Sequence, residues 1–118
     1  MPKAAAYLFL LVALPAGAAS LPPDARKMWR DGDKSFRSRE YADAARNYAV
    51  AGATAPDRPE IAYNEGTSRY RADDFEGAAA GLERAAVLAR SDPTTRARAF
   101  YNLGNAYFRA RNYSNAAR

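Results

Sequence analysis

The chain has 118 residues and a formal net charge of +5, and it contains neither cysteine nor histidine. Its length allows one domain at most, and its positive charges are spread along the chain, which does not favour nucleic acid as a partner. The two missing residue types exclude disulfides, Cys–His and Ser-His-Asp catalytic groups and histidine-rich metal sites.

Residues 1–19 have the layout of a secretory signal peptide. Lys3 precedes an apolar run from Ala4 to Leu14, and small residues follow the run. The run is shorter than the ~20 residues that cross a bilayer, although a membrane anchor stays open as the alternative. We expect cleavage after Ala18 or Ala19, and a mature protein that is periplasmic or secreted in a bacterium, without membrane insertion.

A repeated pattern occupies the chain after a short linker at 20–24. Gly32, Gly66 and Gly104 are separated by intervals of 34 and 38 residues, and the same intervals recur in three other columns. Those columns are Phe36, Tyr70 and Phe108; Tyr41, Phe75 and Tyr113; and Ala44, Ala78 and Ala116. Apolar and small residues recur at helical spacing in each stretch. The sequence therefore predicts an all-α protein in which each repeat is a helix A, a turn and a helix B.

The predicted helices cover 23–38, 41–54, 58–72, 75–90, 93–110 and 113–118. The longer second interval equals about one helical turn and is expected to lengthen a helix. The third helix B should continue beyond residue 118, and its visible start should fray or find a partner.

Acidic and amide side chains stand where these helices begin, and such side chains accept hydrogen bonds from free backbone N–H groups. The predicted caps are Asp57 with Glu60, Asp74, Asp92 before Pro93, and Asn112. On one helix A, Glu65 and Arg69 are four residues apart, and this spacing predicts an ion pair.

The repeats resemble the tetratricopeptide repeat (TPR), a 34-residue helix–turn–helix unit with characteristic glycine, alanine and aromatic places. The third repeat matches best, at Phe100, Leu103, Gly104, Tyr107 and Ala116. In the first two repeats, Asp31 and Glu65 stand at the leucine place. The resemblance implies a TPR domain over 25–118, a right-handed superhelical stack of antiparallel helix pairs. Its repeats would be 25–58, 59–96 and the partial 97–118.

A narrower resemblance rests on the segment AFYNLGNAYFRARNY at 99–113, the preceding YNEG repeat, the longer link between them and the signal peptide. Together they resemble the small exported TPR proteins of bacterial Bat (aerotolerance-type) gene clusters. Members of that family are typically encoded near a MoxR-type ATPase and von Willebrand factor A proteins. The resemblance implies envelope proteins of such a system as candidate partners.

The TPR resemblance also implies that the helices A line a concave groove that binds a partner. The groove-facing places and their neighbours carry aromatic, arginine and asparagine side chains. The predicted partner-binding residues are Trp29, Arg37, Tyr63, Asn64, Tyr70, Arg71, Arg98, Tyr101, Asn102 and Arg109. Two alternatives stay open, because the aromatic residues can simply pack neighbouring repeats together and the arginines can form a solvated face.

The expected function is that of a non-catalytic protein–protein interaction scaffold in the bacterial cell envelope. It would bind a protein or peptide segment in the groove, without a cofactor or a metal. The alternative function is a structural repeat module that self-associates through exposed end helices, as stacked repeats do when no capping helix covers them.

Overall fold

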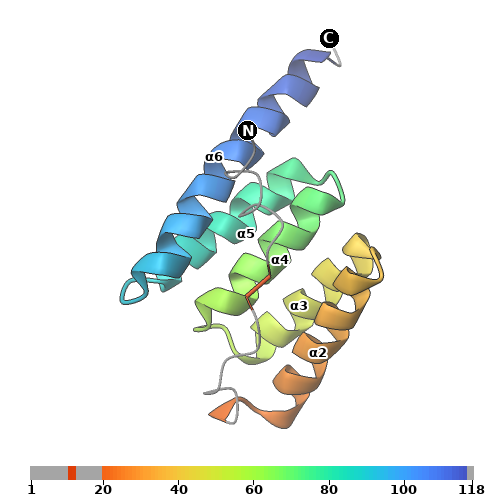
Figure 1. Cartoon of the computed structure of the whole chain (residues 1–118), viewed down its shortest axis with the longest axis vertical. Coiled ribbons are helices and arrows are strands. Elements are labelled where there is room, and N and C mark those ends of the chain that lie inside the picture. The colour runs from red at the N-terminus through yellow and green to blue at the C-terminus, as the bar shows by residue number, and fades with distance from the viewer. Residues whose placement is uncertain (1–10, 13–19, 117–118) are drawn as a thin grey trace.

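The structure is a computed structural model that describes residues 11–12 and 20–116, with side chains as far as residue 112. Within these ranges the chain forms five α-helices and no strand (Figure 1). They are α2 (Pro23–Arg37), α3 (Tyr41–Thr54), α4 (Pro59–Arg71), α5 (Phe75–Leu88) and α6 (Pro93–Ala116). The all-α prediction is confirmed. The predicted signal peptide lies outside the described residues except at 11–12.

Consecutive helices pack against each other along the chain, and α4 also contacts α6. Figure 1 shows them as one row that starts with the pair α2 and α3 and ends with α6. The pairs α2–α3 and α4–α5 are the predicted helices A and B of the first two repeats. Over the ranges that the structure describes, no helix combines the length and the apolar character needed to cross a membrane.

The first four predicted helices agree with α2 to α5 to within two residues at each end. The extra residues of the third repeat lie in its helix A, as expected. Helix α4 begins at Pro59, 7 residues before Gly66, whereas α6 begins at Pro93, 11 residues before Gly104. The difference of four residues is one added turn of helix.

The prediction of a turn near 111–112 followed by a third helix B is wrong. Helix α6 continues without a break to Ala116. In the first two repeats the corresponding turns need a positive φ, 61° at Arg39 and 63° at Asp73, which costs about 1–2 kcal/mol for a non-glycine residue. The packing of the following helix B against helix A offsets that cost. Continuing α6 instead adds one backbone hydrogen bond per residue and needs no residue at positive φ, so the unbroken helix is favoured at 111–112.

Two of the predicted caps are confirmed. Asp74 Oδ1 accepts from the Gly77 N–H at 3.0 Å, and Asp92 Oδ1 accepts from the Thr95 N–H at 3.1 Å. The other two are wrong. Helix α4 starts after Arg58 without a side-chain cap, which leaves Asp57 outside it, and Asn112 lies inside α6.

The buried apolar residues form two clusters. The first cluster surrounds Trp29 and Tyr48 between α2, α3 and the start of α4, and the second surrounds Tyr63 and Leu82 between α4, α5 and α6. Close contact between helices A and B depends on glycine, because a Cβ on Gly66 would lie 2.8 Å from Leu82 Cγ and 3.0 Å from the Leu82 backbone nitrogen. Helix α4 packs against α3, α5 and α6, which places it in the middle of the molecule.

Candidate functional site

Helix α4 is buried on nearly every side. Each residue from Ile61 to Ser68 is buried, although four of them are polar: Asn64, Glu65, Thr67 and Ser68. Removing a polar group from water costs free energy unless the group finds a hydrogen-bond partner. The partners of these side chains therefore show what each face of α4 contacts.

The side chain of Asn64 binds the main chain of Val12 through two hydrogen bonds. Its Oδ1 accepts from the Val12 N–H at 2.9 Å, and its Nδ2 donates to the Val12 carbonyl at 3.1 Å. A primary amide carries an acceptor and a donor side by side. It therefore pairs with both groups of one residue, as a neighbouring antiparallel strand does. Inside a helix both groups are already used, so this contact selects a non-helical segment.

The side chains of residues 11–12 contact the two apolar clusters on either side of Asn64. Leu11 packs against the cluster that contains Trp29, and Val12 packs against the cluster that contains Tyr63. Figure 1 draws this pair as the short red segment that crosses α4. We call the surface formed by Asn64 and the adjoining edges of the two clusters the α4 face. It holds a main chain by its amide and two apolar side chains by packing.

Asn102 occupies the place in the third repeat that Asn64 occupies in the second. It is fully buried, and its Nδ2 donates to Tyr63 Oη at 2.9 Å. Burial raises the pKa of Tyr63, more than the hydrogen bond from Asn102 lowers it, so the phenol stays protonated at neutral pH. Asn102 Oδ1 is buried and has no hydrogen-bond partner among the described residues. That oxygen is an acceptor for a further N–H group.

The aromatic series of the sequence analysis divides into buried and exposed members. Trp29 and Tyr63 are fully buried, and Tyr70 is nearly so, whereas the Tyr101 ring is 44% exposed. The buried rings pack repeats together and support the α4 face from beneath. Contact of a partner with the exposed Tyr101 stays a prediction.

Two arginines of the series, Arg71 and Arg109, form joints between repeats. The guanidinium carbon of Arg71 lies 4.5 Å from the ring centroid of Tyr41 and 5.8 Å from that of Phe36. Arg71 Nη2 also donates to Tyr41 Oη at 2.6 Å. Tyr41 and Phe36 belong to the preceding repeat and pack edge to face, with centroids 5.1 Å apart. Arg71 therefore holds α4 against the first repeat.

The same joint recurs one repeat later. The guanidinium carbon of Arg109 lies 4.7 Å from the Phe75 ring centroid and 5.8 Å from that of Tyr70, and these two rings again pack edge to face. Arg37 occupies the same column in the first repeat and is exposed. The arginine spacing follows the stacking of repeats, and contact of these arginines with a partner stays a prediction.

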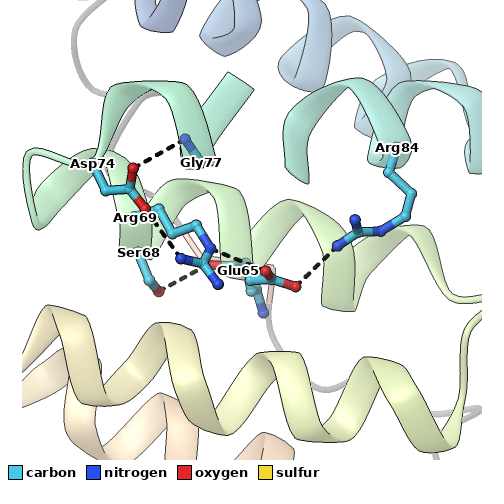
Figure 2. A network of polar contacts seen from close by, with 7 residues as sticks. Glu65, Ser68, Arg69, Asp74, Gly77 and Arg84 are labelled. Atoms are coloured by element: carbon cyan, nitrogen blue, oxygen red, sulfur yellow. Dashed lines mark hydrogen bonds and ion pairs between the residues drawn. The ribbon is translucent and has the colours of Figure 1, made fainter. Parts of the chain in front are cut away.

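The residue next to Asn64 in α4, Glu65, belongs to an ion-pair network. Glu65 accepts from Arg69 Nε at 3.0 Å, which confirms the predicted pair, and from Arg84 Nη2 of α5 at 2.9 Å. Figure 2 shows Arg69 reaching from Glu65 to Asp74, the cap of α5. Glu65 and Arg84 line a cleft of about 250 Å³ between α3, α4 and α5. The network ties helix A to helix B in the second repeat.

The remaining predicted site residue, Arg98, lies with Tyr101 along one side of α6. Both line an open hollow of about 540 Å³ with Pro93, Thr94 and Ala97. Arg98 is partly buried. The hollow follows the first turns of α6, which continue the series of helices A beyond α4.

Another side of α6 exposes large rings. Phe100 is 51% and Tyr107 is 53% exposed. A Cβ added to Gly104 between them would meet no atom within 4 Å, whereas the corresponding positions Gly32 and Gly66 are covered by the next helix. The side of α6 that corresponds to a packed face in the first two repeats is therefore uncovered in the described residues.

Sequence reasoning missed the contact made by residues 11–12 and the aromatic pairs under the arginines. The aromatic pairs had a signal, since Phe36, Tyr41, Tyr70 and Phe75 keep the same spacing as the arginines. The contact of Val12 with Asn64 spans 52 residues and has no local signal. No family model, no curated protein and no solved structure matches this chain.

Proposed function

We propose that this chain is a TPR-type interaction scaffold of the bacterial cell envelope that binds a non-helical segment of a partner protein. The binding surface would be the α4 face and its continuation along α6. The observation that carries the proposal is the pair of hydrogen bonds between the Asn64 amide and the main chain of Val12. It shows this surface in contact with a non-helical, apolar segment.

Three further observations support the TPR type. The intervals of 34 and 38 residues match one repeat and one repeat lengthened by a turn. The glycine of each of the first two repeats packs against the following helix, at Tyr48 and at Leu82. Arg71 and Arg109 join successive repeats in the same way. In this proposal the stack is right-handed and its helices A line the binding groove.

The envelope location rests on the layout of residues 1–19, which is that of a secretory signal peptide. The partners proposed from the Bat-type resemblance are envelope proteins encoded with a MoxR-type ATPase and von Willebrand factor A proteins. The proposed mode is recognition without catalysis. The α4 face contributes hydrogen bonds of an amide and apolar contacts, which fix the position of a segment and its direction.

Site-specific photo-crosslinking in cells that make the protein tests the proposed function. A photoreactive residue at Tyr101, on the predicted binding side, should give a discrete crosslinked species. The matched control is Val87, which is 58% exposed on α5, a helix B. Crosslinking at position 101 but not at 87 is expected. Equal yields of the same species at both positions, or none at position 101, would contradict the proposal.

A second candidate function, self-association, is favoured by the uncovered side of α6. Phe100 and Tyr107 flank the open position at Gly104, so the helix of another copy could pack there as α5 packs on Gly66. Sedimentation equilibrium of the wild type and of Tyr107→Glu separates the two cases. If the wild type associates and Tyr107→Glu does not, the result supports self-association. A strictly monomeric wild type at high concentration contradicts it.

A further inference from the structure

Residues 11–12 belong to the same chain as the surface that they occupy. Val12 uses both of its backbone groups on Asn64, and both of its neighbouring clusters receive an apolar side chain from this pair. A partner segment that binds in the same way needs the same amide and the same two apolar contacts. The two segments therefore cannot bind at once.

We infer that residues 11–12 are an intramolecular occupant of the α4 face that competes with an extended, apolar partner segment. The inference rests on the proposed function and deepens it, because it defines the chemistry of the partner. That segment presents the N–H and C=O of one residue to Asn64. It places two consecutive apolar side chains against the clusters of Trp29 and Tyr63.

A second observation extends the site along the stack. Asn102 Oδ1 is a buried acceptor without a hydrogen-bond partner among the described residues. It lies one repeat beyond Asn64 in the same column. A partner main chain that continues from α4 towards α6 would donate one N–H to Asn102. A partner longer than two residues would use both asparagines, whereas Val12 uses only Asn64.

The tether makes the intramolecular occupant a strong competitor. Seven residues, 13–19, separate Val12 from Ser20 in the sequence. The covalent connection gives the occupant an effective concentration on the order of 1 mM, so an occupant with an intrinsic dissociation constant of about 0.1 mM weakens the apparent affinity of a partner segment about 10-fold. The predicted cleavage after Ala18 or Ala19 would detach residues 11–12 from the domain. Export would then uncover the site.

Binding of a labelled peptide to the full chain tests the inference. The probe is a fluorescent peptide with the sequence of residues 8–16, followed by two lysines for solubility. In Val12→Pro the main chain lacks the N–H that Asn64 accepts, so the intramolecular segment is weakened. In Val12→Ile, the matched control, the N–H and the apolar side chain remain. The probe should bind Val12→Pro at least ~10-fold more tightly than it binds the wild type or Val12→Ile.

The outcomes separate this inference from the proposed function. Adding Asn64→Ala to Val12→Pro should lower probe affinity about 10-fold, the effect of losing an amide pair. Equal probe affinity for the wild type and Val12→Pro would overturn the competition while leaving binding on the α4 face intact. No binding of the probe to Val12→Pro, with an unchanged circular dichroism spectrum, would overturn both.

Discussion

Arg71 of α4 donates a hydrogen bond of 2.6 Å to the hydroxyl of Tyr41 in α3 and lies 4.5 Å from the centroid of the same ring. The contact joins the second repeat to the first. It combines a hydrogen bond with a cation–π interaction, and a planar guanidinium is suited to both. Arg71, like Arg109 one repeat later, therefore has a structural role between repeats.

Replacing Arg71 by alanine should destabilise the protein by about 1–2 kcal/mol, because it removes a charged hydrogen bond and a cation–π contact. Arg37→Ala is the matched control, since Arg37 has the same place in the first repeat but is exposed. Arg37→Ala should lower the free energy of unfolding by no more than about 0.5 kcal/mol. Urea unfolding measures both. Equal losses for the two variants would contradict the joint described above.

Glu65 and Asp31 give a second matched pair. Both stand at the leucine place of their repeats, but the Glu65 side chain is 11% exposed and binds two arginines. The Asp31 side chain is 41% exposed and, among the described residues, pairs with the exposed Lys27. Glu65→Ala should cost about 2 kcal/mol because two charged hydrogen bonds are lost. Asp31→Ala should cost at most about 0.5 kcal/mol. Chemical denaturation that ranks them in the opposite order would refute this reading of the network.

Sequence alone predicted the features that depend on local spacing. Helix periodicity located α2 to α5, and the caps at Asp74 and Asp92 followed from their places before helices. The pair of Glu65 with Arg69 followed from a spacing of four. Each of these interactions forms within a few residues, so the chemistry of the segment determines it.

The features that sequence did not predict depend on contacts between residues far apart in the chain, or on whether a helix turns or continues. An arginine suits a partner-binding surface and a joint between repeats equally well. The residue type alone therefore could not decide which of the two roles Arg71 has. Trp29 and Tyr63 are buried by elements far along the chain. The turn expected near 111–112 is absent because α6 continues there without the positive φ found in the turns at Arg39 and Asp73.

Alanine at two glycines should have opposite effects on stability. Gly66→Ala would place a Cβ 2.8 Å from Leu82 Cγ and 3.0 Å from a backbone nitrogen, so a loss of about 1–3 kcal/mol is expected. Gly104→Ala meets open space and gains helix propensity, so the monomer should become more stable by up to about 1 kcal/mol. Thermal unfolding at low concentration measures both. A loss of stability at Gly104 in a monomer would show that this side of α6 is covered.

The cap of α6 predicts a dependence on acid. Hydrogen bonds from Thr95 hold the pKa of Asp92 below its ordinary value. The stabilisation is therefore present above the unfolded-state pKa, near 4, and is lost as the pH falls through the lower folded-state pKa. Asp92→Asn keeps an acceptor but lacks the charge, so the wild type should exceed it in stability by about 0.5–1 kcal/mol at pH 6.

That difference should shrink towards zero near pH 2, as measured by urea titration at each pH. Asp57→Asn is the control, because Asp57 caps no helix and is exposed. It should show little difference from the wild type at either pH. A constant gap between Asp92→Asn and the wild type from pH 6 to pH 2 would show that the charge of Asp92 does not matter.

The binding of a non-helical main chain by Asn64 is the contact on which the proposed function depends most. Amide hydrogen exchange of Val12 in the full chain measures this contact directly. The Val12 N–H should exchange at least ~10-fold more slowly than in a free peptide, because its hydrogen bond to Asn64 in a partly buried site protects it. Asn64→Ala should abolish this protection while the Leu82 amide in α5 stays protected, and Asn105→Ala on α6 should leave Val12 unchanged. Exchange of Val12 at the free-peptide rate in the wild type, or protection that survives in Asn64→Ala, would contradict the account.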